Sequence, residues 1–168
     1  MTRTILREGL GAGLAFVLAA LPTQADAQQA LPKEYGYTLA GRTPGATYFL
    51  SGIQRGAEPE SVEAWVWVVT PDAVASESQQ FDAQAQWSIM RCTANSIEVI
   101  RTEYYLDGQF LKSLEVPTGP AKTFRAGTPM ALIWNTACDR AVRFKADYVD
   151  SIEQVYAIAK GRQLAGVK

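Results

Sequence analysis

The sequence predicts an α+β domain: an antiparallel β-sheet of about five to six strands, with a C-terminal helix packed on it and one disulfide. Segments with strand character come first and are joined by turns, whereas helical spacing appears only after Gly127. That order is typical of helices that pack on an antiparallel sheet. The chain has 168 residues and two cysteines, Cys92 and Cys138, which we expect to form the disulfide once the protein is exported.

The first 27 residues are predicted to be a cleaved signal peptide. They combine a basic start, with Arg3 and Arg7, an apolar run over residues 10–21 and the small-residue motif Ala25-Asp26-Ala27. The apolar run is too short to span a bilayer, and no later run could span one, so we expect a protein that is not membrane-spanning. The expected location is the periplasm or the cell surface.

Residues 28–46 are predicted to be a loosely ordered lead-in, because they are rich in Gly, Pro and Ala. The main domain follows over residues 47–138 and begins with a short strand at Thr47–Leu50. Residues 139–168 are expected to form a C-terminal helical extension. Roughly 140 residues remain after cleavage, which is enough for one domain but not for two.

The most distinctive strand is predicted at Glu60–Thr70, where the segment VEAWVWVV precedes Pro71. Both of its faces are apolar, although a strand with one face in water would alternate apolar with polar residues. Trp65 and Trp67 are therefore predicted to lie in the core. We expect the chain's own helices to cover the tryptophans, and the alternatives are a second copy in a homodimer or a ligand.

A further strand and a hairpin are predicted after a polar connection over residues 71–83. The strand covers Gln84–Cys92 and contains Trp87. The segment from Ile97 to Leu106 is rich in β-branched and aromatic residues. Asp107-Gly108 is a strong signal for a tight turn, and the return strand is expected over residues 109–116.

The first helix is predicted to begin at Thr128 and Pro129. Thr128 is a favoured N-cap residue, and proline suits the first helical position because no intrahelical partner is lost there. Apolar residues then recur at helical spacing, which predicts that Ile133 and Trp134 pack on the sheet as core residues.

A second helix is predicted from about Ser151 to Lys160, within the C-terminal extension. The acidic residues Asp150 and Glu153 form a capping-box pattern at its start, and Gly161 suits its end.

The chain contains no histidine, which removes the Ser-His and Cys-His nucleophile systems, most zinc sites and the usual haem ligand. The carboxylate pairs Glu58/Glu60 and Asp147/Asp150 fit turns and helix caps better than catalysis. We therefore predict that the protein is not an enzyme, with no catalytic residue, metal or cofactor. The formal net charge of −1 argues against nucleic acid as a partner.

Aromatic side chains are the remaining candidates for a binding surface, and the predicted set is Phe81, Trp87, Tyr104 and Tyr105. Tyr104 and Tyr105 are consecutive in a strand and must point to opposite faces, with Trp87 expected beside them in the sheet. An exposed aromatic binding face is one interpretation. Sheet core together with an ordinary surface tyrosine is the other.

Four segments occur in an order that resembles the bacterial surface-adhesin protein E-like family: AWVWVV, WSIMRC, YYLDG and GTPMALIWNTAC. In that family a tryptophan-containing strand is followed by a strand that ends in cysteine, a hairpin, and a helix that ends in the second cysteine. The similarity covers about Thr47 to Cys138. Phe124 stands where the family tends to have tryptophan, and the residues after Cys138 are additional.

The resemblance implies an antiparallel sheet with a helix held to it by the Cys92–Cys138 bridge, in a surface or periplasmic protein. The best-known member is an adhesin that binds host matrix and serum proteins. We therefore expect an exported, non-enzymatic binding or adhesion-type module of a bacterial envelope, whose partner is an extracellular or envelope protein. A periplasmic carrier of small hydrophobic ligands is the alternative, suggested by the surplus of apolar strand faces.

Overall fold

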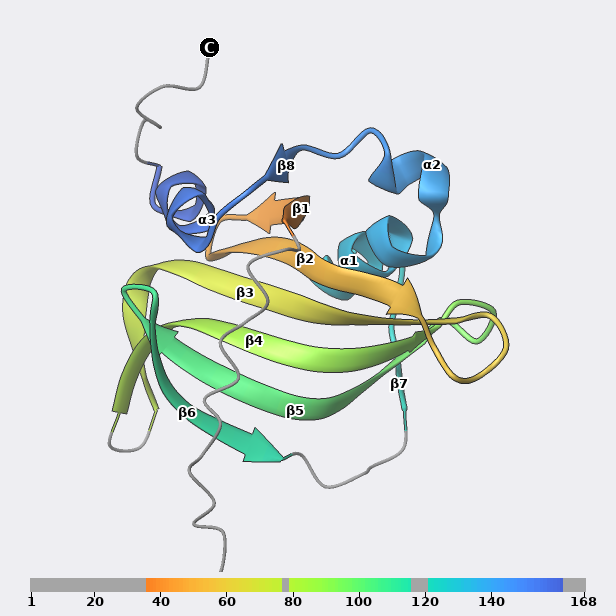
Figure 1. Ribbon diagram of the computed structural model, residues 1–168, viewed down its shortest axis with the longest axis horizontal. Coiled ribbons are helices and arrows are strands. Elements are labelled where there is room, and N and C mark those ends of the chain that lie inside the picture. The colour runs from red at the N-terminus through yellow and green to blue at the C-terminus, as the bar shows by residue number, and fades with distance from the viewer. Residues whose placement is uncertain (1–35, 77–78, 116–120, 162–168) are drawn as a thin grey trace, which may run out of the picture. The chain divides into compact units, whose positions relative to one another are not determined.

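The computed structural model describes residues 36–76, 79–115 and 121–161 (Figure 1). The predicted signal peptide, residues 1–27, lies outside the described residues, as does the start of the predicted lead-in. Within the described part of the chain, no helix has the length and hydrophobicity needed to cross a membrane.

The described residues form an antiparallel sheet with helices packed on it, which confirms the predicted α+β class. The sheet has eight strands in the order β6-β5-β4-β3-β2-β1-β8, with β7 paired to β5 beyond this path (Figure 1). The strands are β1 Tyr37–Thr43, β2 Ala46–Arg55, β3 Ser61–Ser76, β4 Gln79–Arg91, β5 Ser96–Leu106, β6 Gln109–Glu115, β7 Lys122–Thr123 and β8 Tyr148–Val149.

Part of the predicted lead-in is a strand, which corrects that expectation. β1 pairs with β2 through a tight turn, in which the backbone N–H of Ala46 donates to Oγ1 of Thr43 at 3.2 Å. Tyr37 is buried in the core. The glycines of this segment suggested disorder, but the apolar residues of β1 gain more from packing than the glycines cost in entropy.

The described residues of the polar connection predicted over residues 71–83 belong instead to two long strands, residues 71–76 to β3 and residues 79–83 to β4. We expected the first of these strands to end at Pro71, but β3 continues to Ser76. Its pairing with β4 is interrupted after Val69 and resumes at Val74 with a shifted register. Residues 70–73 of β3 there face the single residue Asp82 of β4. A bulge of this kind accommodates proline, which cannot donate to a regular ladder.

The β5–β6 hairpin forms as predicted. Asp107 and Gly108 both have positive φ angles, +48° and +79°, as the two central residues of a type I′ turn require. The register of β5 against β6 shifts between Tyr104 and Tyr105.

The first predicted helix is confirmed as α1, Pro129–Cys138, with Thr128 as its N-cap. A single turn, α2, covers Arg140–Arg143. The second predicted helix is α3, Ile152–Ala159.

The cap of α3 differs from the predicted pairing by one residue. Ser151 is the N-cap and its hydroxyl accepts from the backbone N–H of Gln154, while the Gln154 side chain accepts from the backbone N–H of Asp150. The residues from 139 to 161 are also not purely helical, because β8 lies between α2 and α3.

The two faces of the sheet are covered by different helices. On one face, α3 packs its Val155 and Tyr156 against Trp67, which is fully buried. On the opposite face, α1 packs Ile133 against Val66. The chain's own helices therefore pack on both apolar faces of β3; of the two tryptophans that we expected them to cover, Trp67 is fully buried and Trp65 is only partly buried. The face that carries Trp67 is called the tryptophan face below.

The four predicted core residues are not buried to the same extent. Trp67 and Ile133 are fully buried, whereas Trp65 and Trp134 are partly buried at the edges of the two cores. Inside the core, the indole N–H of Trp67 donates to the hydroxyl of Ser51 at 3.0 Å, which satisfies its polar atom.

The predicted disulfide is confirmed. Cys92 and Cys138 are bonded, with their Cα atoms 5.6 Å apart. The bridge joins the residue after β4 to the last residue of α1. It therefore fastens α1 to the opposite face of the sheet.

Candidate functional site

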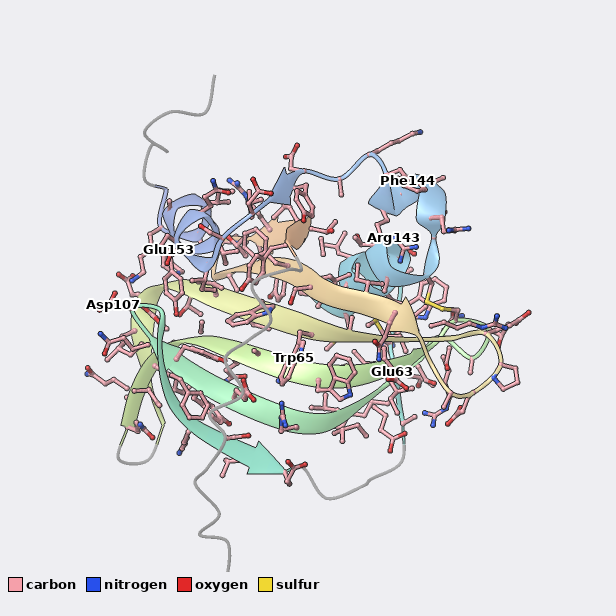
Figure 2. All side chains as sticks on the ribbon, in the orientation of Figure 1. Glu63, Trp65, Asp107, Arg143, Phe144 and Glu153 are labelled. Carbon is pink, nitrogen blue, oxygen red and sulfur yellow. A yellow bond between two sulfur atoms is a disulfide. The ribbon has the colours of Figure 1, made fainter. Side chains whose placement is uncertain are left out.

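The helix on the tryptophan face is too short to cover that face. α3 has eight residues, a length of about 12 Å, whereas β3 has 16 residues and β4 has 13, each more than about 40 Å long if straight. In Figure 2, Trp65 and Glu63 lie on the part of β3 away from α3. We call this part of the face, with Glu63, Trp65, Trp87, Arg101 and Glu103, the open half.

Two tryptophans form the centre of the open half. Trp65 on β3 and Trp87 on β4 are direct cross-strand partners, and their ring centroids lie 5.4 Å apart with the planes tilted by 58°. Both side chains are partly exposed. The guanidinium of Arg101, the β5 partner of Trp87, lies 4.9 Å from the Trp65 ring centroid. The three side chains therefore form a continuous aromatic and cationic surface over three strands.

Buried polar contacts hold Arg101 in place. The Glu103 carboxylate accepts an N–H of Arg101 at 3.0 Å and the hydroxyl of Tyr105 at 2.7 Å. Burial, together with the hydrogen bond to Glu103, raises the pKa of Tyr105 well above its ordinary value. Nε of Arg101 is buried and has no hydrogen-bond partner within the described part of the chain. Glu103 thus orients the guanidinium over Trp65.

The rim of the open half is acidic. Glu63 accepts from the side-chain amide of Gln54 at 3.1 Å. Farther along, Arg91 forms ion pairs with Glu58 at 2.7 Å and Glu98 at 3.0 Å. The hydrogen bond from Arg91 lowers the pKa of Glu58.

The four residues of the predicted aromatic surface do not come together. Phe81 is buried and contacts Tyr104, with ring centroids 5.0 Å apart. Tyr105 lies in the core, 5.0 Å from the Trp67 ring. Trp87 is beside Trp65 and Arg101, whereas Tyr105 pairs with Ala83, so the expected neighbourhood of Trp87 with the tyrosines is not found.

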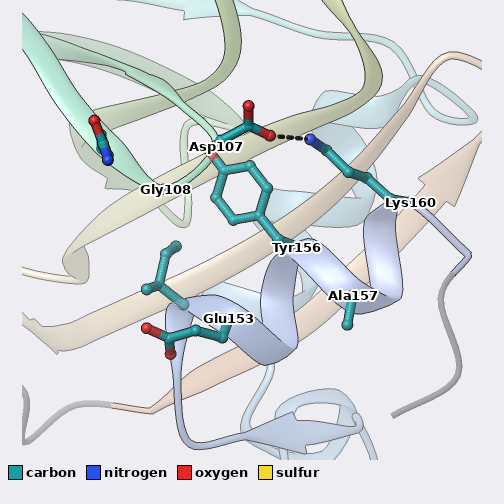
Figure 3. Close-up of a pocket in the computed structure, with 8 residues that line it drawn as sticks. Asp107, Gly108, Glu153, Tyr156, Ala157 and Lys160 are labelled. Atoms are coloured by element: carbon teal, nitrogen blue, oxygen red, sulfur yellow. Dashed lines mark hydrogen bonds and ion pairs between the residues drawn. The ribbon is translucent and has the colours of Figure 1, made fainter.

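A buried polar cluster fastens α3 to the other end of the tryptophan face. Asp82 on β4 is only 1% exposed. It accepts the hydroxyl of Tyr156 at 2.8 Å, the ammonium of Lys160 at 2.8 Å and the backbone N–H of Asp107 at 3.1 Å. Lys160 also pairs with the Asp107 carboxylate at 2.8 Å (Figure 3). We call these four residues the Asp82 cluster.

Strongly alkaline solution is expected to weaken the Asp82 cluster. Hydrogen bonds to Asp107 and Asp82 raise the pKa of Lys160 above its ordinary 10.5, and burial raises that of Tyr156 above its ordinary 10.0. The folded protein therefore retains both protons at a pH where the unfolded chain loses them. This contribution to stability is fully present below about pH 10, where the unfolded chain also keeps both protons, and it decreases as the pH rises from there toward the raised pKa values of the folded protein.

Urea titrations at about pH 8 and about pH 11 measure this effect. Tyr37, whose pKa burial raises to about 12, contributes with the same sign. Because the variant Lys160→Met lacks the group whose pKa is raised by Asp107 and Asp82, it should lose less stability between about pH 8 and about pH 11 than the wild type. Equal losses in the two proteins would contradict the contribution of Lys160.

The sequence did not single out Asp82, Arg101 or Lys160. Asp82 carried one signal, since an isolated acid stands between Phe81 and Ala83 in a segment that forms a strand. Within the residues that the structure describes, no group of three or more His, Cys, Asp or Glu side chains could hold a metal ion. No family model, curated protein or solved structure matches the chain.

Proposed function

We propose that the protein is an exported, non-enzymatic binding module of adhesion type, which contacts an envelope or extracellular protein through the open half. The observation that carries the proposal is the partly exposed Trp65–Trp87 pair with Arg101 beside it. The resemblance of the segments around these strands to surface-adhesin protein E-like proteins supports the same class of function.

The composition of the open half suits protein recognition. Tryptophan and arginine are the residue types most enriched among those that dominate binding energy at protein interfaces. Trp65, Trp87 and Arg101 lie on three paired strands, and Glu103 orients the arginine. Because Glu103 already holds the Arg101 guanidinium, little of that side chain's entropy is lost when a partner docks.

A carrier of small hydrophobic ligands has less support. Such carriers bury the ligand in a mostly apolar cavity. The pocket beside α3 is lined in part by Asp107, Glu153 and Lys160, whose charges would have to be desolvated by an apolar ligand.

The test compares three strains. One carries the intact gene, one has the gene deleted, and the third has the gene deleted and expresses a Trp65→Ala/Trp87→Ala variant of the protein instead. We expect deletion to reduce adhesion to host-matrix or envelope proteins, and the double variant to reduce it at least tenfold, because each tryptophan contributes about 1–2 kcal/mol of binding free energy. Purified proteins on a surface-binding sensor give the same comparison as an affinity.

Phe144→Ala is the matched control. Phe144 is also aromatic and is 81% exposed, but it follows α2 and lies away from Trp65 (Figure 2). Its removal should leave adhesion unchanged. Circular dichroism checks that the double variant is folded, and Trp65→Phe provides a milder change if it is not. If gene deletion changes neither the adhesion of the cells nor the set of proteins that they bind, the proposal is wrong.

A further inference from the structure

A pocket of about 430 Å³ lies between α3 and the tip of the β5–β6 hairpin, apart from the open half (Figure 3). Its volume is within the range of small-molecule sites. The hairpin contributes Asp107 and Gln109, and α3 contributes Ile152, Glu153, Tyr156 and Lys160. The walls therefore combine apolar surface with charged groups.

The two carboxylates of the pocket lie at opposite ends of it. Glu153 is in the first turn of α3, whereas Asp107 is held by Lys160 at the end of that helix. Figure 3 shows Glu153 and Asp107 on either side of the Tyr156 ring. Glu153 and Lys160 are seven positions apart, which is a rise of about 10 Å along a helix. The Tyr156 ring lies between the two ends, and Ile152 adds apolar surface to the lining.

Negative charge exceeds positive charge at this site. Asp107 and Glu153 line the pocket, and Asp82 lies beneath it, bonded to Tyr156 and Lys160. Lys160 is the positively charged residue among those that line the pocket, and it already forms ion pairs with both Asp82 and Asp107. A cationic ligand is therefore favoured over an anionic one.

We propose that this pocket binds a linear aliphatic diamine or polyamine. One ammonium group would lie at Glu153 and the other at Asp107, with the methylene chain along Ile152 and the ring of Tyr156. Both carboxylates also have contacts within the chain, but a carboxylate offers about four lone-pair sites and can accept a ligand as well. Diamines with about four to five methylene groups are the probes with which we test the pocket.

Each part of the pocket recognises a different property of such a ligand. The two carboxylates require two cations, because a single ammonium group can occupy only one end. The apolar wall between them requires a chain with no polar group at its centre, since a buried hydroxyl there would lose its hydrogen bonds to water. The Tyr156 ring, which already lies 5.2 Å from the Lys160 ammonium, offers the methylene chain an apolar surface.

Isothermal titration calorimetry of the exported chain with 1,4-diaminobutane and 1,5-diaminopentane tests the proposal. We expect saturable binding of both diamines, at least tenfold weaker binding of 1-aminobutane, and no binding of 1,4-butanediol. Raising the salt concentration should weaken the diamine more than the monoamine, because two ion pairs are screened instead of one. Equal affinity for diamine and monoamine, or no heat with either diamine, would overturn it.

A charge-matched pair of variants locates the site. Glu153 is exposed on α3, so Glu153→Gln should keep the fold and weaken diamine binding at least tenfold. Glu115→Gln removes the same charge at the far end of β6 from the pocket and should leave binding unchanged. Equal effects of the two variants would contradict the assignment. The Trp65→Ala/Trp87→Ala variant should bind diamine normally, so the adhesion proposal and this one can fail separately.

Discussion

Replacing Asp82 by alanine is expected to lower the free energy of unfolding by about 3 kcal/mol, with chemical denaturation in urea as the measurement. The substitution removes the carboxylate that accepts the hydrogen bonds of the Tyr156 hydroxyl, the Lys160 ammonium and the Asp107 backbone N–H. Breaking a buried ion pair typically costs about 3–5 kcal/mol, because the remaining charge stays buried without its partner. We expect a cost at the lower end of this range, because Lys160 keeps its ion pair with the exposed Asp107.

Two further variants separate this explanation from a general loss of packing. Asp107→Asn removes the exposed partner of the same lysine while keeping a residue that tolerates a positive φ, and should cost less than about 1 kcal/mol. Asp82→Ala/Lys160→Met removes both buried charges and should recover part of the lost stability. A double variant that is less stable than Asp82→Ala would contradict the role of the uncompensated lysine.

The Asp82 cluster also explains how so short a helix stays in place. An isolated helix of eight residues is not stable in water, so α3 depends on its tertiary contacts. Val155 and Tyr156 supply the apolar part by packing on the aromatic core, and Lys160 fastens the end of the helix to β4. Loss of the cluster should therefore expose Trp67 first, and tryptophan fluorescence at low urea concentration would report it.

Features with a local cause could be predicted from the sequence. The Thr128-Pro129 start of α1 and the Asp107-Gly108 turn depend on backbone preferences of two adjacent residues, and both are found where they were expected. The Cys92–Cys138 bridge followed from having two cysteines in a chain expected to be exported. The apolar pattern of β3 likewise indicated that helices would pack on both of its faces, and α3 and α1 do so.

Features that depend on distant partners could not be predicted. The bulge opposite Asp82 requires the β3–β4 register, and the lysine that neutralises Asp82 is 78 positions away in sequence. Trp65 and Trp67 look equivalent in the sequence, yet α3 covers one and leaves the other at the edge. Only the length and position of that helix distinguish a core tryptophan from a candidate binding residue.

Removing the disulfide, through Cys92→Ala/Cys138→Ala or by reduction, is expected to destabilise the protein by about 4 kcal/mol. The two cysteines are 46 positions apart, and cross-linking a loop of that size lowers the entropy of the unfolded chain accordingly. For a domain of this length, the thermal midpoint should fall by about 12–16 °C. Calorimetry with and without reductant measures the change.

The fold should survive the loss of the bridge at low temperature, because α1 remains packed through Ile133 and Ala137. Far-ultraviolet circular dichroism should therefore be nearly unchanged, while urea unfolds the variant at a lower concentration. The double alanine variant is its own control, since reductant should not alter its midpoint. A wild-type midpoint that stays constant while mass spectrometry shows two free thiols would mean that packing alone holds α1 on the sheet.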